Sequence, residues 1–372
     1  MEVAPANRRK AFAVRRSQLG AAEARALAQA VESGWVGTGV YARLFESRFA
    51  AFAGAARCAA VNSGTAALHL ALEAAGARGG EVLLAPLDAV ATAHAVALAG
   101  AHPVFCDVDP ERGTLDPAAA EAAVTPRTRA IVAVHLRGVP CDLTPLRSLA
   151  RRRGLTLVED CCQALGGSYR GRPLGAWGDA GAFSFGRHKT LTTEDGGALV
   201  YRRAAWDGRL GRLRRLGLSG AGQTAGRGAL RSVGWRYRMN DLSAVLGLSQ
   251  LARWKGIESG LRAVRAAYED ALDGHPFLSL PAPLPHTERA WSYFSVRARG
   301  RRAAALSRHL RARGVDAVAW APPTHLFALH RGGRRLPVAE AYWKDFVDLP
   351  FGSTVTPTDA GRAAEALKTF RG

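Results

Sequence analysis

Short apolar runs alternate with longer segments of helical period through the first half of this chain. Some runs, such as residues 130–134 (AIVAV), are apolar on both faces of a strand. Strands of this kind are typical of a parallel sheet that helices cover on both sides. The alternation therefore predicts an α/β fold with a largely parallel central sheet. The expected strands are 58–61, 81–85, 103–107, 130–134, 156–160, 180–185 and 198–201, and the helices expected between them are 66–76, 89–99, 117–123 and 143–153.

A smaller α/β unit is expected after this region. The stretch 242–272 has a helical period, and a proline-rich segment separates it from strand-like 292–298, helix-like 303–313 and strand-like 315–320. We predict a large domain over residues 1–245, of which about the first 15 residues are loose. A linking helix and a small C-terminal domain are predicted over 246–372. The segment 209–228, rich in Gly and Arg, is expected to be a mobile loop.

The composition is that of a globular protein with a large core. The chain has 372 residues, and no apolar run approaches the roughly 20 residues that a membrane helix needs. Its first residues lack the apolar centre of a signal peptide, so a cytoplasmic location is predicted. The odd number of cysteines and the absence of C-x-x-C spacing argue against disulfides and against a zinc site. We expect no metal and interpret the thiols as packing groups: Cys58, Cys106, Cys141, Cys161 and Cys162.

One carboxylate and one lysine stand out in the second half of the predicted sheet. Asp160 ends a strand-like run, and Lys189 follows 29 residues later in a turn rich in Ser, Thr and Gly. A pyridoxal phosphate (PLP) site needs this pair of side chains. The carboxylate keeps the pyridine nitrogen protonated, and the lysine forms a Schiff base and then moves protons. A lone lysine would indicate only a solvated surface charge.

A possible phosphate cradle precedes this pair. Ser63, Gly64 and Thr65 follow an expected strand and open an expected helix. A helix N-terminus offers unpaired backbone N–H groups, and the two hydroxyls add to an anion site. An ordinary helix cap by Ser63 or Thr65 would explain the same residues. Because Asp160 and Lys189 lie downstream, we favour a site for the cofactor phosphate.

The whole pattern resembles the DegT/StrS family of PLP-dependent sugar aminotransferases. The resemblance runs from about Gln18 to about Leu367 and rests on E-D-x-x-Q, G-D, F-S-F, a lysine and a G-G turn. It implies the aspartate aminotransferase-like fold type I, with a mostly parallel seven-stranded sheet, and a homodimer with shared active sites. The matching positions are Glu159, Asp160, Gln163, Gly178, Asp179, Phe183, Ser184, Phe185, Lys189, Gly196 and Gly197.

The resemblance assigns roles to individual residues. Lys189 and Asp160 are implied to be catalytic, and Gln163 is implied to lie near the ring oxygen of the cofactor. The phosphate is implied to contact Ser63, Gly64, Thr65 and Ser184, together with Arg236 of the other subunit, which stands where the family has Asn or Lys. Residues expected on the substrate side are Trp35, in an S-G-W turn, His188 and His325.

Two positions depart from the family pattern. The family carries an aromatic residue that stacks on the cofactor, and its place here falls on Ala89 or Val90, since the register is one residue short. Glu194 replaces a glycine in the turn after the lysine. Loss of the ring could widen the substrate pocket, weaken cofactor binding or mark altered chemistry.

The net charge of +20 must also be explained. Only 5 of the 51 basic residues are Lys, and the Arg residues are mostly scattered without a nucleic-acid-binding motif. An Arg bias of this kind is typical of a GC-rich genome. An anionic small substrate, such as a nucleotide-linked sugar, suits this charge better than a nucleic acid.

The resemblance therefore predicts transfer of an amino group from an amino acid, in the family usually L-glutamate, to a keto-sugar. Such a reaction serves amino-sugar, antibiotic or other specialised-metabolite biosynthesis, and the acceptor is expected to be nucleotide-linked. Two alternatives remain open: an aminocyclitol or aminobenzoate-type enzyme of the same family, and a PLP-fold protein without transaminase activity. Relatives that dehydrate sugars carry His where Lys189 stands, which argues against that branch.

Overall fold

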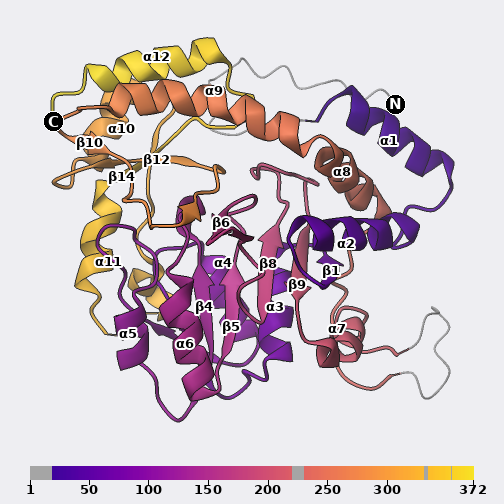
Figure 1. Ribbon diagram of the computed structural model, residues 1–372. Helices are drawn as coiled ribbons and strands as arrows, with labels where there is room; N and C mark the ends of the chain where they lie inside the picture. The colour runs from indigo at the N-terminus through magenta and orange to yellow at the C-terminus, as the bar shows by residue number, and fades with distance from the viewer. Residues whose placement is uncertain (1–18, 220–229, 331–333, 353) are drawn as a thin grey trace.

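A seven-stranded sheet forms the centre of the computed structural model, which describes residues 19–219, 230–330, 334–352 and 354–372 (Figure 1). The strand order is β1-β9-β8-β5-β4-β2-β3, and only β9 runs against the other strands. The predicted mostly parallel sheet is thus confirmed. Its strands are β1 (Arg57–Val61), β2 (Glu81–Leu84), β3 (His102–Phe105), β4 (Thr128–Val134), β5 (Thr156–Asp160), β8 (Ala180–Ser184) and β9 (Gly197–Tyr201).

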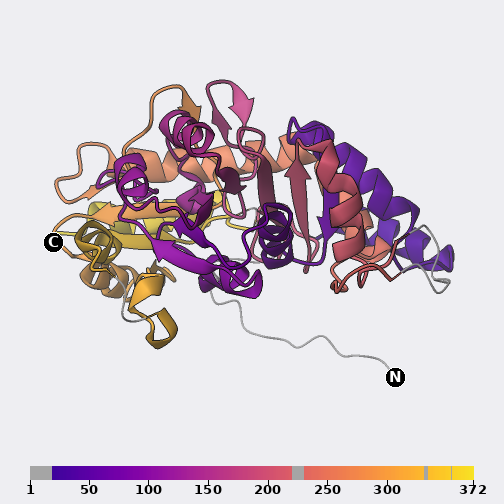
Figure 2. The ribbon, with the colours of Figure 1, turned by 90° about the horizontal axis from the view of Figure 1, so that it is seen from below.

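Helices cover both faces of this sheet, as the view from below shows (Figure 2). Successive residues of β4 face different cores: Ile131 and Ala133 face one, and Ala130 and Val132 face the other. This is the period of two that a doubly covered strand requires. The first core includes residues of α2 (Val40–Phe52), α5 (Pro117–Ala122) and α6 (Leu143–Arg153), and the second includes residues of α3 (Gly64–Ala74), α4 (Val90–Leu98) and α7 (Asp207–Leu213).

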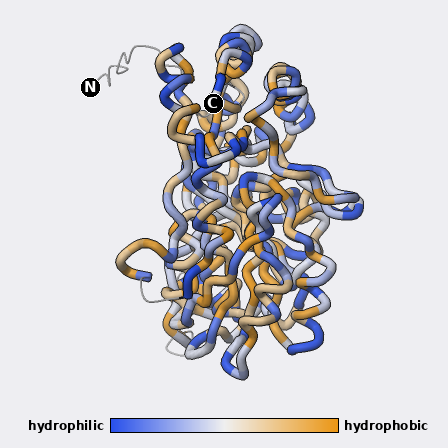
Figure 3. Tube along the Cα trace, turned by 90° about the vertical axis from the view of Figure 1, so that its left-hand side faces the viewer, coloured by the Kyte–Doolittle hydropathy of each residue, from blue (hydrophilic) through white to orange (hydrophobic). Residues whose placement is uncertain are grey.

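The hydropathy of the chain follows this arrangement. Hydrophobic segments concentrate in the body that holds the sheet, and hydrophilic segments follow the outer turns (Figure 3). None of the helices within the described residues is long and apolar enough to cross a membrane.

A second, antiparallel sheet has its own core. Its order is β10-β12-β14-β13, and α9 packs along α12 above it (Figure 1). The helix expected over 242–272 is divided at Arg253 into α8 and α9. The elements are α8 (Asp241–Ala252), α9 (Trp254–Leu272), β10 (Leu278–Ser279), β12 (Phe294–Ala298), α10 (Ala303–Arg311), β13 (Val318–Ala319), β14 (Phe346–Leu349) and α12 (Pro357–Lys368).

The remaining elements lie around these two sheets. Three short strands form a third sheet in the order β11-β6-β7, and α1 packs against α8. They are α1 (Ala21–Glu32), β6 (Ser168–Tyr169), β7 (Arg172–Pro173), β11 (Thr287–Glu288) and α11 (Pro337–Tyr342). The division of the chain at residue 245 stays a prediction, and this position lies inside α8.

One expectation needs correction. The segment predicted as a mobile loop, 209–228, begins within α7, which continues to Leu213 because Leu210 and Leu213 are buried against the sheet. Positions 220–229, and the loose end predicted over the first residues, lie outside the described residues.

Candidate active site

A cavity of about 240 Å³ lies at the edge of the main sheet where the parallel strands end. The strands β1, β2, β5 and β8 all have their carboxyl ends on this edge, which is where open α/β sheets place their ligands. Residues predicted from different parts of the sequence therefore meet here. The lining residues are Ser63, Gly64, Thr65, Leu68, Asp88, Ala89, Ala91, Thr92, Asp160, Cys162, Gln163, Ser184, Gly186, Lys189, Asp195 and Gly196.

The N-terminus of α3 forms one wall of this cavity. Ser63 caps the helix, because its hydroxyl accepts a hydrogen bond from the Ala66 N–H at 3.1 Å. A Cβ atom at Gly64 would lie 2.7 Å from Cys162 Sγ and 2.8 Å from the Cβ of Ser184. Only glycine fits this close approach. The amides of the first helical turn have no partner within the helix, so this wall suits an anion.

Asp160 lies at the end of β5 and is almost fully buried. One of its carboxylate oxygens accepts the Cys162 N–H at 2.9 Å, and the other accepts the hydroxyl of Thr92 at 2.9 Å. Gln163 follows in the same turn, and its side-chain oxygen accepts the Arg137 N–H at 2.9 Å. A backbone donor thus orients the Gln163 amide, and its NH₂ group must point the other way.

Lys189 lies in the connection between β8 and β9. Its backbone N–H donates to the Gly186 carbonyl at 2.9 Å, and its Nζ lies 5.9 Å from the ring centroid of Tyr293. The next residue, Thr190, donates a hydrogen bond to Ser292 at 3.0 Å. The lysine is therefore held between the main sheet and the segment that leads into the second sheet.

Two further polar residues of the cavity are absent from the sequence prediction. Asp88 follows β2, and Thr92 lies in the first turn of α4. The Asp88 carboxylate accepts the Gln163 amide at 2.7 Å and also hydrogen-bonds Thr92. Burial, and then the negative charge of Asp160, raise the pKa of Asp88 to about 7. The only indication in the sequence that Asp88 belongs to the site is its place directly before Ala89, where the family's aromatic residue is missing.

The two residues predicted as candidates for the missing aromatic, Ala89 and Val90, lie differently in the structure. Ala89 lines the cavity, whereas Val90 does not, and its side chain is exposed. Glu194 has a φ of 62°, in the left-handed region that favours glycine, which explains why a glycine is expected in this turn.

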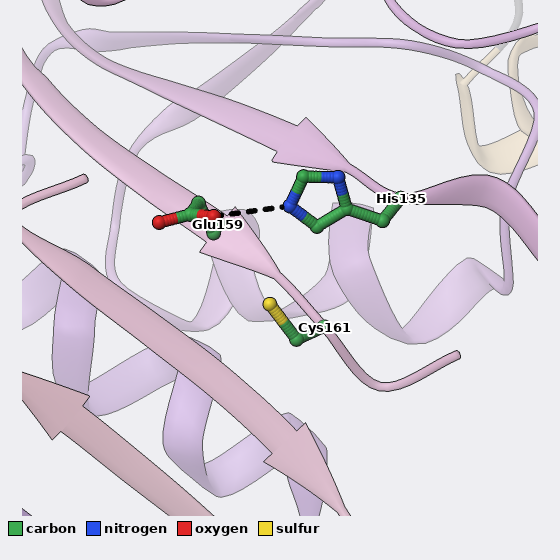
Figure 4. A group of neighbouring side chains, drawn as sticks. All are labelled: His135, Glu159 and Cys161. Carbon is green, nitrogen blue, oxygen red and sulfur yellow. Dashed lines mark hydrogen bonds and ion pairs between the residues drawn. The ribbon is translucent and has the colours of Figure 1, made fainter. Parts of the chain in front are cut away.

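Three buried side chains, those of His135, Glu159 and Cys161, lie close together near the end of β5 (Figure 4). The Glu159 carboxylate accepts the N–H groups of Gly175, Trp177 and Gly178 at 2.7–2.8 Å. His135 accepts the Cys141 N–H through Nδ1 at 3.0 Å, so its Nε2 carries the hydrogen and donates to Glu159 at 3.2 Å. With Cys161, these residues form the only metal-like cluster found among the described residues. Hydrogen bonds already use its histidine and carboxylate, so we interpret it as structural.

Four residues predicted for the site do not line this cavity. Trp35 and Arg236 are exposed, and Arg236 forms an isolated β-bridge with Arg215. His188 is exposed in the turn before Lys189. His325 is buried, and its Nε2 lies 3.4 Å from Glu340. Their predicted roles in binding stay predictions.

Known proteins are similar to this chain in sequence and in fold. The model of the DegT/DnrJ/EryC1/StrS aminotransferase family matches residues 17–368. DesV of S. venezuelae is 36% identical with a TM-score of 0.86, covering 93% of this chain and 93% of its own. The aminotransferase TlmJ from Streptoalloteichus hindustanus is 32% identical with a TM-score of 0.89, and the match covers 96% of this chain and 97% of TlmJ. DesI is 33% identical with a TM-score of 0.87, and the match covers 95% of this chain and 91% of DesI.

The family match spans nearly the whole chain, and these solved structures superpose over nearly all of it. Aminotransferases of this family depend on PLP. The cavity offers a lysine, a buried carboxylate and a helix N-terminus. The chain therefore belongs to the DegT/DnrJ/EryC1/StrS aminotransferase family.

Proposed function

We propose that this aminotransferase binds PLP in the cavity at Lys189 and transfers an amino group from L-glutamate to a nucleotide-linked keto-sugar. The observation that carries the proposal is the meeting of Lys189, Asp160 and the α3 N-terminus around one cavity. The acceptor class is supported by DesI, whose structure was determined with its TDP-sugar product.

The donor set of the cavity fits PLP. Asp160 offers a buried carboxylate for the pyridine nitrogen, and Gln163 offers an oriented amide for the ring oxygen. The hydroxyls of Ser63, Thr65 and Ser184, together with the first amides of α3, would hold the phosphate. The bare Cα of Gly64 leaves the space that a side chain would close.

PLP supplies an electron sink once it is linked to a lysine. With PLP bound, Lys189 would be the group that takes a proton from the donor's α-carbon and returns one, as base and then acid. Asp160 would place its carboxyl group beside the ring, and its hydrogen bonds with the Cys162 N–H and the Thr92 hydroxyl prevent it from turning away. The Tyr293 ring limits where the freed lysine can move.

A second cavity suits the acceptor. It has a volume of about 670 Å³ and reaches Thr190, the neighbour of Lys189. Its lining includes Arg289, whose guanidinium lies 4.7 Å from the centroid of the Trp291 ring. An arginine on an aromatic face, together with the net charge of the chain, suits an anionic and partly aromatic ligand such as a nucleotide.

We also propose a homodimer whose active sites are shared, in the cytoplasm, where free thiols such as those of this chain persist. The exposed apolar residues of the α1–α2 region, including Trp35, Val36 and Val40, suit burial against another copy. In such a dimer Arg236 would reach the phosphate of the partner's cofactor.

The first test uses purified protein saturated with PLP. L-Glutamate is added without any sugar, and we expect loss of the cofactor's visible band with release of 2-oxoglutarate. A Lys189→Ala variant should show neither the band nor the release. A bound cofactor that ignores glutamate, glutamine and alanine would contradict the aminotransferase assignment.

The shared site has a separate test. Lys189→Ala and Arg236→Ala protomers, each inactive alone, are unfolded together and refolded as a mixture. If Arg236 acts in the partner's site, random pairing restores about a quarter of the wild-type activity, because half of the dimers contain one intact site. Activity that stays at the level of the separate variants would overturn the shared site.

A further inference from the structure

A second carboxyl group lies beside Asp160 in the cofactor cavity. Asp88 and Asp160 come from different strand ends, and both contact the hydroxyl of Thr92. Each carboxyl group has one oxygen toward Thr92. The other oxygen of Asp88 accepts a hydrogen bond from the Gln163 side-chain amide at 2.7 Å. The other oxygen of Asp160 accepts one from the Cys162 backbone N–H at 2.9 Å. The three oxygens thus form a chain from Asp88 through Thr92 to Asp160.

This chain requires one more hydrogen than Thr92 can supply. A threonine hydroxyl carries a single hydrogen, so it can donate to one carboxyl group only. The second contact is a hydrogen bond only if the other carboxyl group is protonated and donates to Thr92. Two ionised carboxyl groups this close would also repel each other, which favours a shared proton.

Asp88 is the better holder of this proton. Its pKa is raised to about 7 by burial and by the charge of Asp160, against smaller opposing effects of Thr92 and Lys189. The other titratable groups around it are Cys162 and Asp195, which line the same cavity. From the second sheet's side, Thr324 contacts the Asp88 carbonyl at 3.4 Å, and the neighbouring His325 faces Glu340.

We propose that Asp88 is a positioning residue of the cofactor site. As a neutral acid it donates to Thr92, which directs the Thr92 hydrogen to Asp160, and it accepts the amide of Gln163. Asp88 thereby holds the two side chains that, under the function proposed above, bind the ring nitrogen and the ring oxygen of PLP.

The proposal predicts a change of charge beside the bound cofactor near neutral pH. When Asp88 loses its proton, the carboxyl pair carries two negative charges instead of one, and Thr92 can no longer satisfy both. The added charge favours the protonated forms of the nearby cofactor nitrogens. The visible spectrum of the bound cofactor then follows the ionisation of Asp88 as well as that of the Lys189 linkage.

The test is a spectral titration of the full-length protein saturated with PLP, without an amino donor, from about pH 5.5 to about pH 9. Asp88→Asn keeps both hydrogen bonds and cannot ionise. We expect it to lack the spectral transition of Asp88 and to keep only the transition of the Lys189 linkage. Thr92→Val should move the wild-type midpoint downward by about one pH unit, because the pair with one proton loses two hydrogen bonds through Thr92 and the fully ionised pair loses only one, and Thr92→Ser should restore it.

Identical titration curves for the wild type and Asp88→Asn would overturn the proposal, and so would a wild-type spectrum that does not change with pH. Thermal unfolding establishes that each variant is folded. If Asp88→Asn does not fold, the contrast between Thr92→Val and Thr92→Ser decides, and equal midpoints for these two would overturn the proposal.

Infrared difference spectroscopy on the protein without PLP separates this proposal from the proposed function. The carbonyl band of a protonated carboxyl group should be present at about pH 6, weaken through neutral pH and be absent from Asp88→Asn. Failure of the protein to bind PLP would contradict the proposed function and leave the proposal for Asp88 and Asp160 unaffected. If the Asp88→Asn variant retains this band, the proposal that Asp88 holds the proton is contradicted, and the proposed function is unaffected.

Discussion

Replacing Asp88 by Asn should stabilise the folded protein more at high pH than at low pH. In the unfolded chain Asp88 has the ordinary carboxyl pKa of 3.8, and in the folded state its pKa is raised to about 7. Between these values the folded state binds the extra proton, so the stability of the wild type falls as the pH rises. Asn at this position carries no such dependence.

The magnitude follows from the size of the shift. Each pKa unit corresponds to about 1.4 kcal/mol, so the shift gives an upper value of about 4 kcal/mol above neutral pH. Asp88 is only partly buried in the open cavity, and water there lowers the penalty. We expect Asp88→Asn to gain about 2 to 4 kcal/mol relative to the wild type between about pH 4 and about pH 8.

Urea unfolding at a series of pH values, at one protein concentration and without PLP, measures this difference. The two proteins should have similar stability near pH 4 and diverge steadily toward neutral pH. Parallel curves, with the same difference at every pH, would refute the reasoning, because they would mean that Asp88 is ionised throughout or that its charge is fully solvated.

Further substitutions test other parts of the site. Gly64→Ala places a Cβ atom 2.7 Å from Cys162 Sγ, so PLP affinity measured by equilibrium dialysis should fall at least tenfold, by about 1.4 kcal/mol or more. Gly256→Ala, on α9 with open space around its Cβ, should leave that affinity unchanged. Asp241→Ala removes a buried carboxylate that accepts the N–H groups of Gly39 and Ala42, at 2.8 and 2.9 Å, and urea unfolding should show a loss of about 3 kcal/mol.

The strands of the main sheet could be predicted because their sequences are buried on both faces. A run such as AIVAV at 130–134 is too short for a helix and too apolar for a loop, and all seven expected strands are present. The two-residue strand β10 carries no such pattern, since two residues cannot show a period, and β13 is two residues of the strand expected over 315–320. The break at Arg253, between α8 and α9, also has no Gly or Pro at that position to signal it.

The candidate site was predictable where its residues belong to a local motif. Lys189, Asp160 and the turn at Gly64 are recognisable because each stands in a short run with its own chemistry. The link between Asp88 and Asp160 is different, because the two carboxyl groups are brought together only by the adjacent ends of separate strands and by Thr92. Proton sharing of this kind depends on distances that no sequence spacing encodes.

The missing aromatic ring can be restored to measure what the cavity lost. Ala89 lines the cavity and Val90 points away from it, so Ala89→Phe should place a ring beside the cofactor and Val90→Phe should not. A stacked aromatic pair is worth about 0.5 to 1.5 kcal/mol, so Ala89→Phe should tighten PLP binding about two- to tenfold, while Val90→Phe should leave it unchanged. Equilibrium dialysis against PLP measures both. If Ala89→Phe weakens binding while remaining folded, the cavity has no room for a ring at residue 89 beside the bound cofactor, and the reasoning is refuted.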